Sequence, residues 1–202
     1  LSVSSGVDHA CALRGDGQPI CWGNPAAIAT SPPAGPYVAL SAGEIENCGL
    51  RSDGLLRCWG GAMSAAAPTA GTFTAVSVSP GRGCAIRTDG TLQCWQAAGV
   101  SSLGTAPAGR YLALSLGTSH ACALRSDGKI QCWGSNAQGQ TNAPSAPNFI
   151  AVASGHQHSC GLQDNGSIAC WGANPSGQLD APTGRFDAIS AGRLHTCARS
   201  EE

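Results

Sequence analysis

The spacing of the cysteines constrains this chain more than any other feature of its sequence. Five pairs recur at steps of 36 to 38 residues, and the two members of a pair are ten residues apart. A tryptophan directly follows the second cysteine of every pair. A fixed period of this length indicates a repeat architecture, in which one unit cannot bury its apolar faces without its neighbours. The pairs are Cys11 with Cys21, Cys48 with Cys58, Cys84 with Cys94, Cys122 with Cys132, and Cys160 with Cys170.

The repeats begin near residues 1, 37, 73, 111, 149 and 186, so five copies are complete and a sixth has only begun. We interpret residues 1–202 as a single β-propeller domain or a segment of one. The sixth copy contains Cys197 but stops before its turn, its second cysteine and its tryptophan. Cys197 is therefore expected to be unpaired. We expect the natural protein to continue beyond this segment.

An Asp-Gly or Asn-Gly step lies at the middle of each cysteine pair, as at Asp127-Gly128. Such a step favours a three-residue hairpin loop, with a type I turn followed by a residue in the left-handed region. This loop places Cys122 directly opposite Cys132, in a non-hydrogen-bonded pair within disulfide reach. We therefore predict one disulfide inside each hairpin. Because side chains alternate along a strand, we also expect one face with Cys122 and Leu124 to be dry and the other to be wet.

Two other states of the cysteines remain as alternatives. Reduced thiols can fill a core, and cysteines can bind zinc. Zinc ligands usually lie two to four residues apart in two clusters, which a ten-residue spacing does not match. Eleven cysteines in 202 residues favour disulfides, and hence an oxidising compartment. We predict an extracellular, secreted or cell-surface location.

Four histidines stand two residues before a first cysteine: His9, His120, His158 and His195. Glu46 and Arg82 hold this place in the second and third repeats, and His156 lies outside the pattern. A metal site would need ligands that converge from different repeats. We favour structural histidines that hydrogen-bond a neighbouring strand, and we expect no metal and no cofactor.

Composition argues against several classes of function. Charged residues make up 11% of the chain and the net charge is −1, so no surface for nucleic acid is indicated. No apolar run is long enough for membrane insertion within this segment. No nucleophile elbow, zinc-protease motif or phosphate loop is present, and we predict no enzyme. Asn165-Gly166-Ser167 is a candidate N-glycosylation site in a hairpin turn.

A unit of about 37 residues with three clear strands, and room for a short fourth, suits one blade of a β-propeller. We predict an all-β fold with one disulfide-clamped hairpin in each complete repeat. An open β-solenoid is the alternative, but its strands run parallel to their neighbours and fit tight hairpins poorly.

The fourth and fifth repeats resemble the regulator of chromosome condensation repeat. The residues that carry this resemblance are Ser119-His120-Ala-Cys122, then Cys132-Trp133-Gly134-Ser-Asn136-Ala-Gln-Gly139-Gln140, and the matching run from His158 to Leu179. The third repeat departs from it with Gln96 after its tryptophan, and the second lacks the Gly-Gln ending.

The resemblance implies a propeller, commonly seven-bladed. Short repeats with paired cysteines are similar to the extracellular domains of crinkly-type receptor kinases and related secreted or surface proteins. The founding nuclear member of the family exchanges nucleotide on a small GTPase, and we do not extend this activity to a chain that matches no exchange motif. The related inhibitor of β-lactamase implies that such a ring can bind a protein through its loops.

Residues 24–36, 62–72 and 97–110 follow three of the tryptophans and differ most between repeats. Insertions of this kind gather on one side of a repeat protein and often form its binding surface. We predict a non-enzymatic module that recognises a protein or peptide partner through this loop face. The alternative is a structural subunit of a cell-surface layer, filament or appendage, in which copies of the chain assemble. No motif identifies the residues that bind the ligand.

Overall fold

A computed structural model describes residues 2–24, 31–145 and 148–200. The chain divides into two compact units, one ending at Ser102 and the other beginning at Leu103. In the described residues the only helix is a short 3₁₀ turn, η2 (Ala62–Ala66), and the other elements are strands. The fold is therefore all-β, as the sequence predicts.

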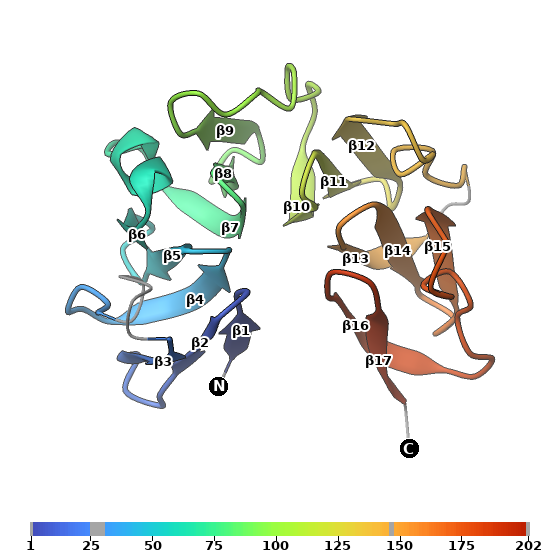
Figure 1. Cartoon of the computed structure of the whole chain (residues 1–202), viewed down its shortest axis with the longest axis horizontal. Coiled ribbons are helices and arrows are strands. Elements are labelled where there is room, and N and C mark those ends of the chain that lie inside the picture. The colour runs from blue at the N-terminus through green and yellow to red at the C-terminus, as the bar shows by residue number, and fades with distance from the viewer. Residues whose placement is uncertain (1, 25–30, 146–147, 201–202) are drawn as a thin grey trace. The chain divides into compact units, whose positions relative to one another are not determined.

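The first unit contains three antiparallel sheets of three strands each (Figure 1). Each sheet corresponds to one repeat, and its strands follow one another in chain order. Their bounds are β1 (Val3–Ser5), β2 (His9–Leu13) and β3 (Pro19–Gly23); β4 (Tyr37–Ala42), β5 (Glu46–Arg51) and β6 (Leu56–Gly60); β7 (Phe73–Ser79), β8 (Arg82–Arg87) and β9 (Leu92–Gln96).

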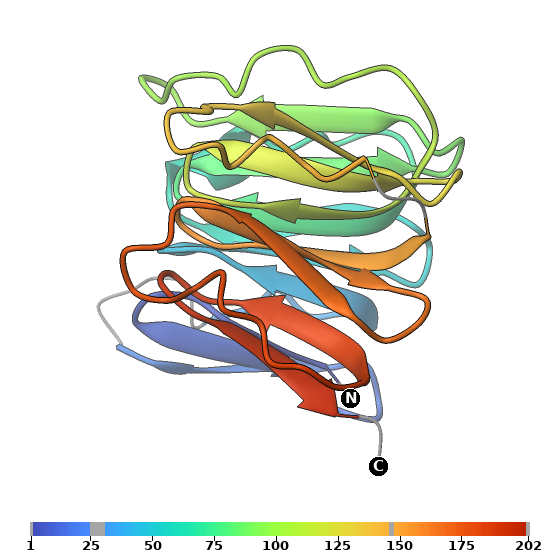
Figure 2. The ribbon, with the colours of Figure 1, turned by 90° about the vertical axis from the view of Figure 1, so that its right-hand side faces the viewer.

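The second unit repeats this plan with two three-stranded sheets and one sheet of two strands, stacked on one another (Figure 2). Its strands are β10 (Tyr111–Leu116), β11 (His120–Arg125) and β12 (Ile130–Gly134); β13 (Phe149–Ser154), β14 (His158–Gln163) and β15 (Ile168–Gly172); β16 (Phe186–Ala191) and β17 (Thr196–Ser200). The described residues add no fourth strand to any sheet. The sheets are blades of a β-propeller fold, and since every ladder is antiparallel, the solenoid interpretation is wrong.

The hairpin of the fourth repeat shows why the register is fixed. Gly128 has a φ of 76°, a left-handed conformation that glycine adopts without strain. Its N–H donates to the Arg125 carbonyl at 3.1 Å, while the Asp127 carboxylate accepts from the Lys129 N–H at 3.2 Å. This loop places Cys122 opposite Cys132, and the predicted register is confirmed.

A disulfide joins the two cysteines of each complete hairpin. The bridges are Cys11–Cys21, Cys48–Cys58, Cys84–Cys94, Cys122–Cys132 and Cys160–Cys170, with Cα atoms 4.0 to 4.1 Å apart. This separation is that of a non-hydrogen-bonded antiparallel pair, where side chains lie closest. Cys197 is a free thiol and is exposed.

The expectation of one dry and one wet face is wrong for the middle strands. In β14, Ser159 and Gly161 are buried although they point away from the disulfide. The sheet of β14 lies between the two other sheets of its unit, so this strand packs against a neighbour on both sides. The hairpin tip, with Asp164 and Asn165, remains exposed.

The core lies between successive sheets, where the disulfide face of one repeat meets the tryptophan face of the next. Cys122, Leu124 and Ile130 pack with Phe149 and Trp171 of the following repeat. In the first unit, Cys48, Leu50 and Leu56 pack in the same way with residues that include Phe73 and Trp95. These two disulfides, Cys48–Cys58 and Cys122–Cys132, therefore lie in interfaces between sheets.

Candidate binding surface

Two kinds of loop lie at the same end of each sheet. One is the turn between the first and second strands, and the other is the segment that follows the tryptophan. Backbone hydrogen bonds join them, from Ser135 N–H to the Ser119 carbonyl at 2.8 Å and from Ala173 N–H to the Gln157 carbonyl at 2.9 Å. We call this end of each unit the turn face. Its turns comprise residues 6–8, 43–45 and 79–81 in the first unit, and 117–119, 155–157 and 192–194 in the second.

Histidines anchor these turns to the next sheet. The Nε2 atom of His120 lies 2.8 Å from Ser159 Oγ, and that of His158 lies 2.9 Å from Thr196 Oγ1. In the first unit, His9 Nε2 lies 2.9 Å from the Asn47 amide oxygen. These are the contacts to a neighbouring strand expected of structural histidines. Sequence analysis missed their partners, although Asn, Ser or Thr stands directly before the next cysteine in each case.

A glycine three residues before each of these histidines makes room for the ring. A Cβ atom at Gly155 would overlap the imidazole of His158, and one at Gly117 would overlap that of His120. The turn thus has the pattern Gly-x-x-His, in which the ends are fixed by packing and the two central residues are free to vary.

Burial keeps the side chains of His120 and His158 neutral. Desolvation, with smaller contributions from the nearby His158 and His156, lowers the pKa of His120 to about 4. Burial also lowers the pKa of His158, with a smaller contribution from His195. Because the imidazoles of His120 and His158 carry no charge near neutral pH, their role is to hold the turns in position.

Glu46 replaces the histidine in the second repeat and is buried. Its carboxylate accepts from the Gly81 N–H at 3.2 Å and from the Ile45 N–H at 3.3 Å. Burial raises the pKa of Glu46, while these two N–H groups lower it and Glu44 raises it. The same anchoring role is therefore performed by an acid that binds backbone.

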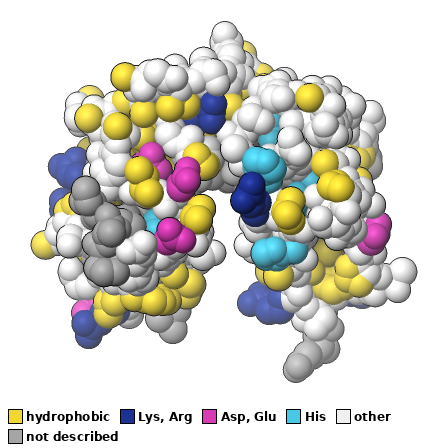
Figure 3. All heavy atoms as spheres, viewed as in Figure 1, with side chains coloured by type: hydrophobic (Ala, Val, Ile, Leu, Met, Phe, Trp, Pro, Cys, Tyr) yellow, Lys and Arg dark blue, Asp and Glu magenta, His cyan; other side chains and the backbone are white. Residues whose placement is uncertain are grey.

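The turn face of the first unit presents apolar and acidic side chains together. Val7 is 68% exposed and Ile45 is 49% exposed, and each adjoins an exposed acid, Asp8 and Glu44. Figure 3 shows acidic side chains gathered beside hydrophobic ones over the turns of this unit. Neither aliphatic side chain belongs to the core, so both are available to a partner. No sequence motif had pointed to them.

The turn face of the second unit has the opposite charge. Arg193, Leu194 and His195 are all exposed, and Leu194 retains 46% of its accessible surface. His156 Nδ1 lies 2.8 Å from Thr118 Oγ1, and the His156 N–H donates to the Arg193 carbonyl at 3.1 Å. Figure 3 shows histidine and basic side chains over these turns. His156, which lies outside the repeat pattern, thus belongs to this surface.

The segments after the tryptophans are anchored at one point and exposed at their tips. The side-chain oxygen of Asn136 accepts from the Thr141 N–H at 3.0 Å, while Gln140 is buried. The Gln140 carbonyl accepts the indole N–H of Trp171 in the next repeat at 2.9 Å. Residues 135–138 are exposed. Such a loop presents a surface without needing to become ordered on binding.

The second repeat lacks the Gly-Gln ending and provides a different acceptor for the tryptophan of the next repeat. Residues 62–72 contain η2, and Met63 of this turn is fully buried. The Met63 sulfur accepts the indole N–H of Trp95 at 2.7 Å. The expected loop is therefore partly helical. Of the predicted loop 24–36, residues 25–30 lie outside the described residues.

The remaining candidate residues are placed as follows. Asn165 lies exposed at the tip of its hairpin, where its side-chain oxygen accepts from the Ser167 N–H at 2.9 Å. Among the described residues, no three His, Cys, Asp or Glu side chains are grouped so as to hold a metal. In the same part of the chain, no helix combines the length and the apolar character that crossing a membrane requires.

Comparison with known proteins supports the repeat assignment. The family model described as the regulator of chromosome condensation (RCC1) repeat matches residues 112–140 and 149–178. No curated protein matches the sequence.

Among solved structures, the CRINKLY ectodomain of the Arabidopsis thaliana receptor kinase ACR4 aligns with a TM-score of 0.83 and 27% identity, over 99% of this chain and 74% of that one. The ectodomain of the Physcomitrella patens receptor kinase CR4 has a TM-score of 0.83 and 28% identity, and the alignment spans 98% of this chain and 58% of that one. Prp20p from Saccharomyces cerevisiae aligns at 0.83 with 15% identity, over 99% of this chain and 69% of that one, which shows the fold alone.

Proposed function

We propose that this chain, which is built from RCC1-type repeats in a β-propeller fold, is a non-catalytic extracellular module that recognises a protein or peptide through its turn face. The observation that carries the proposal is the exposure of Val7, Ile45 and Leu194 beside charged side chains, with the turns of Val7 and Ile45 anchored by the buried His9 and Glu46. Exposed aliphatic side chains with a charged rim are typical of interaction sites.

Two further observations support an extracellular setting. Five disulfides within the hairpins are stable only in an oxidising environment. The two receptor-kinase ectodomains have the highest identity to this chain among the structures compared above. The structure of Prp20p is described with its binding to Gsp1p and histones, so a fold of this kind can bind proteins.

The charges indicate what a partner would present to each unit. The turns of the first unit, with Asp8 and Glu44, favour a basic segment with an apolar residue for Val7 or Ile45. The turns of the second unit, with Arg193, favour an acidic one. Most of the binding energy would come from the aliphatic contacts, because exposed ion pairs contribute about 0–1 kcal/mol.

Photo-crosslinking on the surface of cells of the source organism tests the proposal. The oxidised chain would carry a photoreactive group on Lys129, at a hairpin tip away from the turns. Crosslinked species that disappear in the variant Val7→Ser/Ile45→Ser/Leu194→Ser support it. The matched control is Val38→Ser/Leu112→Ser/Ile150→Ser, which removes aliphatic side chains that are 53 to 65% exposed on the first strands. Equal loss in both variants, or loss in the control alone, would contradict a role for the turn face.

A second candidate function, a subunit of an assembly, is favoured by the sheet of the first repeat. Val3, Ile20 and Trp22 share one face of that sheet and are 70%, 48% and 51% exposed. The equivalent Trp59 in the next repeat is buried against a neighbouring sheet. Sedimentation velocity distinguishes the two candidate functions. Assembly predicts oligomers that dissociate in the Trp22→Ser variant. A wild-type chain that is monomeric at micromolar concentration contradicts assembly.

A further inference from the structure

The last strand, β17, leaves one edge of its sheet open. It pairs with β16 alone, whereas every other sheet has a third strand on the side that β17 leaves free. Backbone N–H and C=O groups on an unpaired edge are a template for another extended strand. Next to this edge, between β15, β16 and β17, the structure has a cavity of about 200 Å³.

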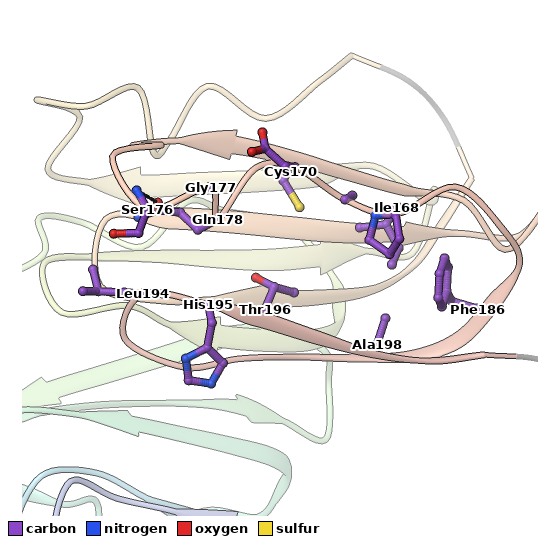
Figure 4. Close-up of a pocket in the computed structure, with 13 residues that line it drawn as sticks. Ile168, Cys170, Ser176, Gly177, Gln178, Phe186, Leu194, His195, Thr196 and Ala198 are labelled. Carbon is purple, nitrogen blue, oxygen red and sulfur yellow. Dashed lines mark hydrogen bonds between the residues drawn. The ribbon is translucent and has the colours of Figure 1, made fainter.

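The preceding repeat shows what fills this position. There the tryptophan of the third strand, Trp171, packs with Phe149 of its own repeat. It also packs with three residues of the repeat before it, Ile130, Cys132 and Ala143. One repeat later, the residues at the same four positions line the cavity. They are Ala181 and the three residues Ile168, Cys170 and Phe186, which Figure 4 labels. The cavity is thus the place of a tryptophan that residues 1–202 do not contain.

Polar groups at the cavity also match an indole. Trp171 donates its N–H to the carbonyl of Gln140, and the equivalent residue, Gln178, lines the cavity. Gln178 is only 5% exposed, and its side-chain Nε2 has no hydrogen-bond partner among the described residues. This Nε2 is a hydrogen-bond donor, as an indole N–H is, so it favours an acceptor such as a backbone carbonyl of an entering segment, whereas the indole N–H would pair with the Gln178 backbone carbonyl.

The strand register shows which residues of an added strand would lie opposite β17. In the fifth repeat, Cys160 lies opposite Cys170 and Ser159 lies opposite Trp171. The equivalent residues of β17 are Cys197, an exposed free thiol, and Thr196, which lines the cavity. A strand in this register would present a cysteine to Cys197 and place the next residue in the cavity.

We infer that β17 and the adjoining cavity form a binding site for an extended segment with the pattern apolar-x-Cys-Trp-Gly, supplied by polypeptide outside these 202 residues. The strand adds antiparallel to β17, its indole enters the cavity and donates to the backbone carbonyl of Gln178, and its cysteine faces Cys197. The other ten cysteines are engaged in disulfides, so none of them can take this place.

Disulfide capture tests this site. The probe is a peptide of residues 166–174 of this chain, Gly-Ser-Ile-Ala-Cys-Trp-Gly-Ala-Asn, whose cysteine is joined to glutathione. The Cys197 thiolate attacks the peptide sulfur, a bond forms between them, and glutathione leaves as its thiolate. Mass spectrometry of the folded, oxidised chain follows the rate of the adduct.

The matched control is the same peptide with alanine in place of tryptophan. We expect it to react with the folded chain at least tenfold more slowly, and both peptides to react equally with the urea-unfolded chain. Ala198→Leu, which fills the cavity from β17, is expected to remove the preference for tryptophan. Equal rates for the two peptides on the folded wild-type chain would overturn the inference. Leu194 and His195 of the turn face also line the cavity, but no variant in this test changes them, so this inference and the proposed function can fail separately.

A non-covalent measurement completes the test. Calorimetric titration of Cys197→Ser with a serine version of the peptide should show binding that the alanine-for-tryptophan peptide lacks. Indistinguishable heats from the two peptides would show that the cavity does not select an indole, which contradicts the proposed site.

Discussion

The indole N–H of Trp171 donates to the backbone carbonyl of Gln140 across the boundary between two repeats, over 2.9 Å. The ring packs at the same time on the disulfide face of the preceding repeat, beside Cys122 and Ile130. One side chain therefore joins two sheets and fixes the loop that leads from one to the next. In the first unit, Trp95 does the same with Met63 as its acceptor.

Replacing Trp171 should separate the contribution of its hydrogen bond to stability from that of its packing. Trp171→Phe keeps an aromatic ring but removes the N–H, and we expect a loss of about 1–2 kcal/mol in the free energy of unfolding. Trp171→Ala also leaves a cavity and should lower it by about 3–5 kcal/mol. Urea denaturation measures both. The control is the exposed Trp22→Phe, expected within ~0.5 kcal/mol of wild type; an equal loss there would show that the inter-repeat contact is not the cause.

Acid should destabilise the chain through His120. Its pKa is about 4 in the folded chain, against an ordinary value of 6.5. Between these values the unfolded chain binds a proton that the folded chain does not, so the free energy of unfolding falls as the pH decreases from 6.5 to 4. At ~1.4 kcal/mol per pKa unit, the free energy of unfolding falls by about 3 kcal/mol in total. Below pH 4 both states bind the proton, so His120 causes no further fall.

Denaturation at several pH values checks this dependence. His120→Gln should flatten the profile between pH 6.5 and 4, while Val38→Ser, which changes an exposed side chain without a titratable group, should leave it as in wild type. A profile that His120→Gln does not change would contradict the assignment of a buried, neutral imidazole.

The Gly-x-x-His turns should tolerate no side chain at their glycine. Gly155→Ala forces the new Cβ against the His158 ring, and we expect about 1–3 kcal/mol of destabilisation. Gly15 has no atom within 4 Å of the place of a Cβ, so Gly15→Ala should be neutral within ~0.5 kcal/mol. Thermal melts of the two variants compare them directly; equal melting temperatures would refute the packing argument.

Asn165 should carry a glycan when a eukaryotic cell secretes the chain. The residue is exposed at a hairpin tip, and Ser167 completes the acceptor sequon. Intact-mass measurement should show added hexosamine and hexose that Asn165→Gln removes. Secreted protein with the unmodified mass would show that this tip is not an acceptor.

How far the sequence predicts this structure depends on the range of the interactions involved. The hairpin register follows from local chemistry, because an Asp-Gly step and a ten-residue spacing define it without reference to other repeats. The burial of Ser159 and Gly161 does not follow from the hairpin alone, because it depends on a neighbouring sheet of the same unit.

The same limit applies to the binding surface. His120 and Ser159 lie 39 positions apart, and no local pattern joins them. Val7, Ile45 and Leu194 stand between the glycine and the histidine, or its substitute, of their turns. An aliphatic residue at a variable turn position was the available signal, but its exposure became evident only once the turns were placed.

The central claim is that each complete repeat closes its own hairpin with its own disulfide. Digestion without reduction by trypsin, chymotrypsin and an Asp-directed protease cuts both within and between the hairpins. Mass spectrometry should then find five linked peptide pairs, each joining cysteines ten residues apart, and Cys197 as a free thiol. Free thiols inside the hairpins, or links between different hairpins, would contradict the account.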